Sequence, residues 1–314
     1  MKKRHPKGFY DSSITRIVPL FNFIRSANTN ERFSAFISCI QGASTYESCA
    51  THNDLKSLLN FGQIIEPIYY GKQGALSDGR TIEPGEKSGL MPQSTHLRWL
   101  INEGGLDPRI RVPTSKDGQN RIDLFADKKG GCKRQNALSL LEEWLDAPHK
   151  KANPWFRFEA PTKPDVYIET KEYILIIEGK RTENKLTTHT SWMDYDRDQL
   201  IRHMDSLCDL STGIHKDNGK PVFGLYLIPS INDPVIKDHE VPYYDYATAC
   251  KRYSSLEYWK RSLPHRIEKY EKSIEIMQKH FLGTLTWEAI ETFGGALSDL
   301  RFPRNKDEMT STSK

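Results

Sequence analysis

Long apolar runs are missing from this chain, and so are paired cysteines. No stretch approaches 18 consecutive apolar residues, which excludes an ordinary transmembrane helix. The start, "MKKRHPKGFYDSS", is basic but has no apolar segment after it, so we expect no secretory signal there. The five cysteines (Cys39, Cys49, Cys132, Cys208 and Cys250) are scattered, and no CxxC pair occurs. Neither a zinc site nor a disulfide framework is indicated, and a cytoplasmic protein with no membrane partner is expected.

A large surplus of one charge is also missing. The 314 residues include 45 Lys and Arg against 41 Asp and Glu, for a net charge of +4. Hydrophobic residues make up 37% and charged residues 27%, which is typical of a globular protein and not of a disordered one. This composition is compatible with a polyanionic partner but does not establish one.

Residues 1–127 read as a mixed region of short helices and loops. The stretch "STHLRWLINEGG" predicts a helix capped by Ser94 or Thr95 and ended by Gly104. A packing helix is favoured over a recognition helix. Residues 71–89 are rich in turn-forming residues and predict an exposed loop.

The pattern becomes more regular after residue 134. "RQNALSLLEEWLD" predicts an amphipathic helix that ends before Pro148, and "WFRFEA" predicts a short strand. Two further strands, 165–169 and 173–180, are joined tightly enough to form a hairpin. A helix over 191–210 and a buried strand over 221–229 follow.

The C-terminal part predicts mainly helices. Its clearest signal is a set of apolar residues at spacings of three and four, which Gly283 ends: Ile267, Tyr270, Ile274, Met277 and Phe281. This stripe fits a helix packed on the core, and the alternative is a seam between two copies of the chain in a homodimer. Residues 304–314 are expected to be frayed.

The hairpin places charged residues in an unusual arrangement. If its turn centres between Lys171 and Glu172, paired residue numbers sum to 343 and Asp165 lies opposite Glu178. Their Cβ atoms would then be roughly 5 Å apart. Two facing carboxylates repel unless a cation lies between them, and Mg²⁺ accepts such oxygen ligands. Lys180 shares the face of Glu178 and could stabilise charge that develops beside the metal.

These residues resemble the PD-(D/E)xK nuclease superfamily. "PD", twelve intervening residues and "EGK" match its signature, and the predicted order αβββαβ is similar to its core. The resemblance covers about residues 130–230. It implies an α/β fold with a mixed sheet and a restriction-endonuclease-like core over 128–235. Residues 1–127 would be an N-terminal region, 236–303 C-terminal helices on the core, and 304–314 a flexible tail.

The resemblance implies a Mg²⁺-dependent nuclease that acts on DNA, with Mn²⁺ as a substitute metal. Asp165, Glu178 and the Gly179 carbonyl would hold the metal, and Lys180 would act at the phosphate. An acid from the preceding helix often contributes, here Glu142 or Glu143, and Glu142 is favoured.

One further motif of the family lies on the helix after the hairpin. Gln199 resembles the glutamine of the exonuclease-like branch, although His203 stands where that branch has tyrosine. Arg181 and Arg202 would contact the nucleic acid, and Gln199 and Arg202 would position phosphate or Lys180.

Other interpretations remain open at this point. Asp165 after Pro164 could open a turn, and Glu178 and Lys180 could form a surface ion pair at a strand end. The fold could also serve a DNA-binding or assembly protein without catalysis, although such proteins usually lose one of the three motif residues. A third interpretation makes residues 1–127 a sensor or specificity module of a restriction or phage-defence nuclease.

Overall fold

The computed structural model describes residues 12–43, 64–70, 90–146, 154–181, 192–193, 197–230, 233, 252–305 and 307–308. The longer helices are α1 (Val18–Ser26), α2 (Thr29–Ala43), α4 (Ser94–Glu103), α5 (Gln119–Ala126), α6 (Cys132–Asp146), α7 (Gln199–Leu207), α10 (Leu256–Ser262), α11 (Ile267–Lys279) and α12 (Trp287–Thr292). Short helical turns are η1 (Ser13–Ile17), η3 (Ser115–Asp117), η5 (Pro264–Arg266) and η6 (Gly295–Leu297). The strands are β1 (Ile64–Tyr70), β2 (Val166–Thr170), β3 (Ile174–Gly179), β4 (Val222–Ile228) and β5 (Phe281–Thr286).

A mixed α/β architecture is built on one five-stranded sheet with the order β1-β2-β3-β4-β5. β1, β2 and β3 are antiparallel neighbours, whereas β3, β4 and β5 run parallel. Parallel neighbours need a crossover connection. α7 supplies the crossover between β3 and β4, and α10 and α11 supply the one between β4 and β5.

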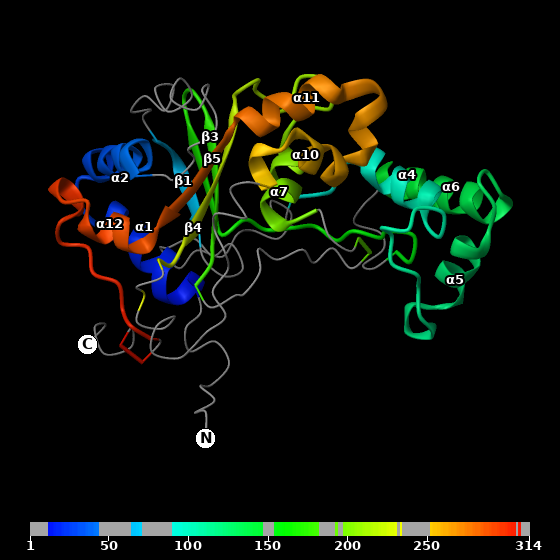
Figure 1. Ribbon diagram of the computed structural model, residues 1–314, viewed down its shortest axis with the longest axis horizontal. Helices are drawn as coiled ribbons and strands as arrows, with labels where there is room; N and C mark the ends of the chain where they lie inside the picture. Colours follow the sequence, from blue (N-terminus) through cyan, green and yellow to red (C-terminus); the bar gives the residue numbers. More distant parts are fainter. Residues whose placement is uncertain are drawn as a thin grey trace.

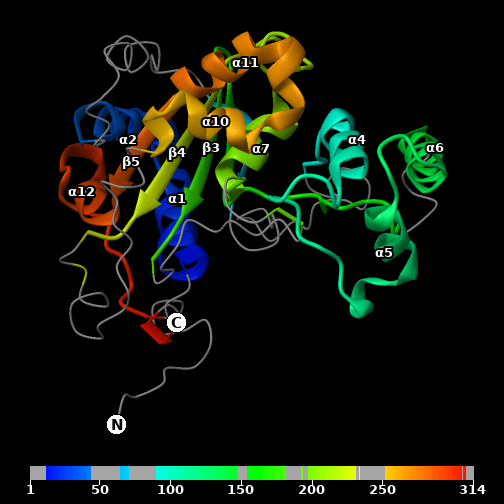
Figure 2. The ribbon, with the colours of Figure 1, turned by 45° about the vertical axis from the view of Figure 1, so that its right-hand side comes forward.

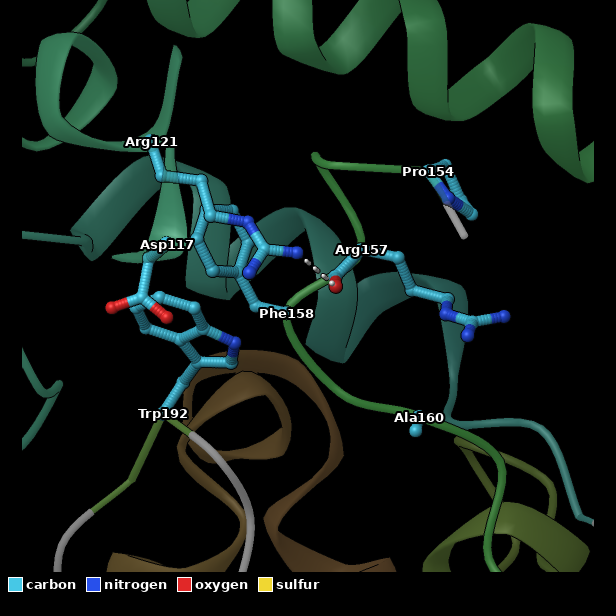
Figure 3. A pocket seen from close by; sticks show the side chains of 7 residues that line it. All are labelled: Asp117, Arg121, Pro154, Arg157, Phe158, Ala160 and Trp192. Carbon is cyan, nitrogen blue, oxygen red and sulfur yellow. Dashed lines mark hydrogen bonds between the residues drawn. The ribbon is translucent and has the colours of Figure 1, made fainter. Parts of the chain in front are cut away.

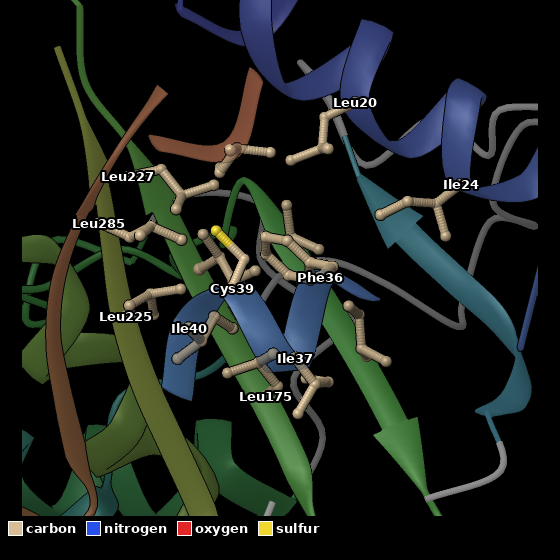
Figure 4. Packing of buried hydrophobic residues seen from close by; sticks show 14 of the residues in the cluster. Leu20, Ile24, Phe36, Ile37, Cys39, Ile40, Leu175, Leu225, Leu227 and Leu285 are labelled. Carbon is tan, nitrogen blue, oxygen red and sulfur yellow. The ribbon is translucent and has the colours of Figure 1, made fainter. Parts of the chain in front are cut away.

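Helices cover both faces of the sheet (Figures 1 and 2). α1, α2 and α12 pack on one face, where Leu20, Phe36 and Ile40 meet Leu175 and Leu225 (Figure 4). α7, α10 and α11 cover the other face, around a second apolar cluster. Because both faces are covered, β3 and β4 are buried along their whole length, which explains their nearly continuous apolar sequences.

A second unit consists of α4, α5 and α6, which lie to one side of the sheet in both views (Figures 1 and 2). It has its own apolar cluster, which includes Leu97, Leu124, Leu141, Phe158 and Trp192. The unit interrupts the chain between β1 and β2. We refer to it below as the helical unit.

The packing does not follow the expected boundary at residue 127. α1 and α2 share a core with the sheet, and β1 belongs to the sheet itself. The predicted helix over 134–146 was assigned to the nuclease-like core, but α6 packs in the helical unit. The predicted strand "WFRFEA" is also wrong, because residues 155–160 form turns and irregular chain. Its apolar side chains Phe156 and Phe158 fill the helical unit's core without needing a strand partner.

The C-terminal part differs from the expected run of helices in one respect. α11 ends at Lys279, and Phe281 and Gly283 lie in β5. Ile274 and Met277 of the predicted stripe are buried against the sheet, whereas Ile267 is 38% exposed. The part of the predicted stripe around Ile274 and Met277 therefore belongs to the hydrophobic core. The predicted loop at 71–89 and the end of the tail, 309–314, lie outside the described residues. Within the described part of the chain, no helix has both the length and the apolar character to cross a membrane.

Candidate active site

The β2–β3 hairpin has the predicted register. Val166 pairs with Ile177 and Glu169 pairs with Ile174, so that paired residue numbers sum to 343. Asp165 immediately precedes β2, and continuation of this register places it opposite Glu178. The sequence alone predicted this register because the polar residues Lys171 and Glu172 mark a tight turn between two apolar segments.

Side-chain alternation directs the candidate residues to one face of the sheet. Ile174 and Ile176 belong to the cluster under α7, and Glu178 and Lys180 continue that alternation. Gly179 faces the other way. A Cβ added there would lie 2.9 Å from Ile17 Cδ1, so only glycine allows η1 this close to β3.

Asp165 and Glu178 form a pair of carboxylates with raised pKa values. Asp165 Oδ2 accepts a hydrogen bond from the Gly179 N–H at 2.9 Å. Burial and the Glu178 charge raise the pKa of Asp165 from 3.8 to about 7, although Lys180 opposes the shift. Burial also raises the pKa of Glu178 to about 7. Burial is therefore the main cause of both raised pKa values, and the Glu178 charge adds to the shift at Asp165.

Lys180 and Gln199 meet beside this pair. Lys180 Nζ lies 3.5 Å from Glu178 Oε2 and donates to Gln199 Oε1 at 3.4 Å. Lys180 is 6% exposed, and its main chain is held on both sides by β4 and α12. The expectation that Gln199 points toward Lys180 is confirmed.

His203 is a second side chain of α7 that contacts the hairpin. Its Nε2 lies 2.5 Å from Glu178 Oε1, and both side chains are fully buried. Burial lowers the pKa of His203 to about 3, with a further contribution from Arg202. A neutral imidazole with its proton on Nε2 satisfies this contact. Sequence reasoning recognised His203 only as a departure from tyrosine, although its position four residues after Gln199 places both on one helical face.

The carboxylate pair fits a hard divalent cation. Glu178 Oε2 is fully buried, and its contact with Lys180 Nζ at 3.5 Å is a long one that leaves room for a closer ligand. Mg²⁺ uses one or two protein carboxylates and keeps several waters. A cation between Asp165 and Glu178 would stabilise the ionised forms that burial disfavours, and it would offset the Glu178 charge that adds to the raised pKa of Asp165. Within the described ranges, no group of three or more His, Cys, Asp and Glu side chains is placed to hold a metal. The fit therefore depends on two carboxylates completed by main-chain or water oxygens.

The start of α7 is fixed by an aspartate that is hydrogen-bonded to three tyrosine hydroxyls. Asp198 caps the helix through the Ile201 N–H and accepts hydrogen bonds from the hydroxyls of Tyr226, Tyr253 and Tyr258. Asp198 directly precedes Gln199. These bonds fix the N-terminus of α7 and therefore the position of Gln199 relative to Lys180.

Arg202 is held by the protein and not presented at the surface. It is 9% exposed, it donates to the Ala160 carbonyl at 3.1 Å, and its Nε lies 3.4 Å from Glu159. Arg181 is 2% exposed and bonds to Thr15 at 2.8 Å, with Asp233 at 3.8 Å. The structure gives both arginines internal partners in place of the nucleic-acid contacts that we expected.

The acid expected from the preceding helix does not reach the hairpin. Glu142 lies on the exposed side of α6 and forms two hydrogen bonds with Arg98 of α4, at 2.7 and 2.8 Å. Glu143 is also exposed on α6. α6 lies well away from β2 and β3 in both views (Figures 1 and 2). Amphipathicity predicted the helix correctly but could not show which core it joins.

The structure thus brings together Asp165, Glu178, Lys180 and Gln199 from the sequence-based set, and adds His203. Comparisons of the chain with protein-family models, with curated proteins and with solved structures give no significant match. A functional assignment therefore has to come from the geometry and chemistry of this site.

Proposed function

We propose that the protein is a Mg²⁺-dependent nuclease with a restriction-endonuclease-like core that hydrolyses DNA phosphodiester bonds. The main support is that Asp165, Glu178 and Lys180 share one face of the hairpin, with Gln199 and His203 of α7 above them. The order of α1, α2, β1, β2, β3, α7 and β4 along the chain also supports the proposal, although α4, α5 and α6 are inserted between β1 and β2 and the first helix and strand are not the predicted ones.

Each side chain has a separate task in this mechanism. Asp165 and Glu178 would hold Mg²⁺ with the Gly179 carbonyl, and His203 would fix the orientation of Glu178. Once bound, the metal would act as a Lewis acid toward the scissile phosphate and lower the pKa of a coordinated water. Gln199 holds the Lys180 ammonium beside Glu178, so that its charge would face the phosphate as negative charge develops in the transition state.

The proposal is tested with a cleavage panel on purified protein. Plasmid, linear duplex, single-stranded DNA and RNA would be incubated with Mg²⁺, Mn²⁺ or EDTA. Lys180→Ala and Asp165→Ala should each lower the rate of DNA cleavage at least about a hundredfold, the scale for one preorganised catalytic group. Lys180→Ala should leave Mg²⁺ binding largely intact, whereas Asp165→Ala should weaken it.

The hairpin itself offers matched controls. Lys171 and Glu172 lie exposed in its turn, so Lys171→Ala and Glu172→Ala remove the same charges from the same element. Both should cut at the wild-type rate. Cleavage by Lys180→Ala at the rate of Lys171→Ala would refute the mechanism. Binding of DNA by a wild-type protein that cuts no substrate would favour the non-catalytic interpretation instead.

A further inference from the structure

A cavity of about 230 Å³ lies in the helical unit, beside the segment that runs on to Asp165. Figure 3 shows two arginines, Arg121 and Arg157, and two aromatic residues, Phe158 and Trp192, in its lining. Ligand pockets usually have roughly 300–1,000 Å³. This cavity therefore has room for one small group and not for a large cofactor.

Arg121 is held in place before any ligand binds. Its Nε donates to the Trp155 carbonyl at 2.5 Å, and its Nη2 donates to the Arg157 carbonyl at 3.5 Å. The guanidinium lies 4.9 Å from the ring centre of Trp192 and 5.4 Å from that of Phe158. These are cation–π distances. Only two of the five N–H donors of Arg121 are bonded within the described residues, so the rest of a rigid fork remains to bind a ligand.

Arg157 brings a second positive charge without a compensating acid. Its side chain is half-buried and lies over Trp144, with the guanidinium 5.4 Å from the ring centre. It forms no ion pair with any residue that the structure describes. Burial lowers the pKa values of Arg121 and Arg157. At Arg121 the Asp117 charge opposes this shift, whereas the charges of Arg111 and Arg157 add to it. Positive charges therefore face one another across the cavity.

The acid in the cavity wall, Asp117, is already engaged. It accepts hydrogen bonds from the N–H and hydroxyl of Thr114, at 2.7 and 2.9 Å, and pairs with Arg111 at 3.3 Å. The bonds from Thr114 hold the pKa of Asp117 below its ordinary value, so it is ionised at neutral pH. Its one negative charge is shared between Arg111 and Arg121, so the three guanidinium groups of Arg111, Arg121 and Arg157 outweigh it. Guanidinium groups bind phosphate through paired N–H donors, which makes phosphate the matching anion.

The cavity is connected to the candidate active site by a short segment. Ala160 lines the cavity, its carbonyl accepts a hydrogen bond from Arg202 beside His203, and Asp165 follows five residues later. Five residues span at most roughly 17 Å. A DNA strand rises about 3.4 Å per nucleotide, so this span corresponds to about five nucleotides.

We propose that this cavity is a second phosphate site, where Arg121 and Arg157 hold the backbone of the DNA substrate within about five nucleotides of the scissile phosphate. The inference depends on the proposed function, because the phosphate in the cavity would belong to the DNA strand that the hairpin site cuts. It gives the helical unit a role in holding substrate.

The test measures how DNA binding depends on salt, in the full chain carrying Asp165→Asn to prevent cleavage. Loss of one phosphate contact reduces the slope of log K against log salt concentration by about 0.7–0.9, which is roughly a fivefold loss of affinity near 0.15 M salt. Arg157→Ala should show this change, and Arg157→Lys should restore the slope because it keeps the charge. Lys272→Ala, which removes an exposed lysine of α11, is the matched control and should change neither quantity. Oligonucleotides that end at the cut should not respond to Arg157→Ala, whereas those that extend at least about five nucleotides beyond it should.

The outcomes separate the two proposals. If DNA binds and the slopes for Arg157→Ala and Lys272→Ala coincide, the second site is refuted while the proposed function stands. Inorganic phosphate and a nucleoside monophosphate would be titrated as well. If Arg157→Ala weakens their binding but not that of DNA, the cavity takes a free phosphate and the role in holding the strand is refuted. If the parent protein neither binds nor cuts nucleic acid, the proposed function fails and this inference fails with it.

Discussion

Replacement of Asp165 by asparagine should stabilise the metal-free protein at neutral and alkaline pH. Burial and the Glu178 charge raise the pKa of Asp165 from 3.8 to about 7. Each pKa unit corresponds to 1.36 kcal/mol, so ionising this side chain in the folded protein costs about 2–4 kcal/mol, with the lower figure applying while Glu178 keeps its proton. Asparagine cannot ionise, and its amide oxygen can still accept the Gly179 N–H that Asp165 Oδ2 accepts now.

The direction of the pH dependence follows from the raised pKa. Because the folded pKa exceeds the unfolded value, the wild-type protein in EDTA loses free energy of unfolding as pH rises from about 4 through about 7. Asp165→Asn should remove much of this loss. The difference in free energy of unfolding should be small near pH 4 and reach about 2–4 kcal/mol near pH 8.

Urea unfolding with EDTA and with Mg²⁺ measures both effects. Mg²⁺ should stabilise the wild-type protein, because a ligand that binds only the folded state raises its stability, and it should stabilise Asp165→Asn much less. Glu172→Gln, in the exposed turn of the hairpin, is the control. A variant Asp165→Asn that is no more stable than wild type near pH 8 in EDTA would show that burial and the Glu178 charge do not raise the pKa of Asp165 as argued.

Three other substitutions test the surroundings of the site. Gly179→Ala should lower the free energy of unfolding in urea by about 1–3 kcal/mol, because the new Cβ would lie 2.9 Å from Ile17 Cδ1. An unchanged free energy of unfolding would contradict this close packing of η1 on β3. His203→Leu leaves Glu178 Oε1 without its partner, so calorimetry should show Mg²⁺ affinity about 10–100-fold lower; an unchanged affinity would remove His203 from the site. Glu142→Ala should leave DNA cleavage unchanged and alter stability by less than about 1 kcal/mol, and a loss of cleavage would return α6 to the site.

The hairpin and its charged residues could be predicted because the information is local. The strands 166–170 and 174–179 are separated by three residues, so the tight turn sets their register and places Asp165 opposite Glu178. The two-residue period of a strand then places Lys180 on the face of Glu178. Gln199 was chosen by its resemblance to the family's helix motif. It lies beside Lys180 because α7 is the helix between the parallel strands β3 and β4, which need a crossover connection.

Long-range features could not be predicted from the same patterns. The sequence of α6 is amphipathic, but an apolar stripe does not say which core it meets. The segment between β1 and β2 is long enough to hold the helical unit, so the first strand of the sheet lies about a hundred residues before the hairpin. The charges of Arg181 and Arg202 suggested that both are exposed. Inside the protein, however, Arg181 donates a hydrogen bond to Thr15 and Arg202 forms an ion pair with Glu159.

α7 is the element that relates the helical unit to the hairpin. Gln199 and His203 face the hairpin, and Arg202 and Asp205 lie on another side of the helix. The second side meets a buried ionic network, in which Arg197 joins Glu159 at 2.9 Å and Asp205 at 2.7 Å. The network reaches α4 through His96, which lies 3.0 Å from Glu159, and reaches the start of α11 through Arg266, which lies 2.7 Å from Asp205.

This buried ionic network keeps its two acids ionised and ties the helical unit to α7. Burial alone would raise the pKa values of Glu159 and Asp205, but Arg197 and the neighbouring histidines help to hold both well below their ordinary range, so both acids stay ionised. Removing one partner from a buried ion pair typically costs about 3–5 kcal/mol, because the remaining charge is left without compensation. The helical unit is therefore held firmly against α7. If its cavity holds a phosphate of the substrate, the same contacts fix the distance between that phosphate and the hairpin carboxylates.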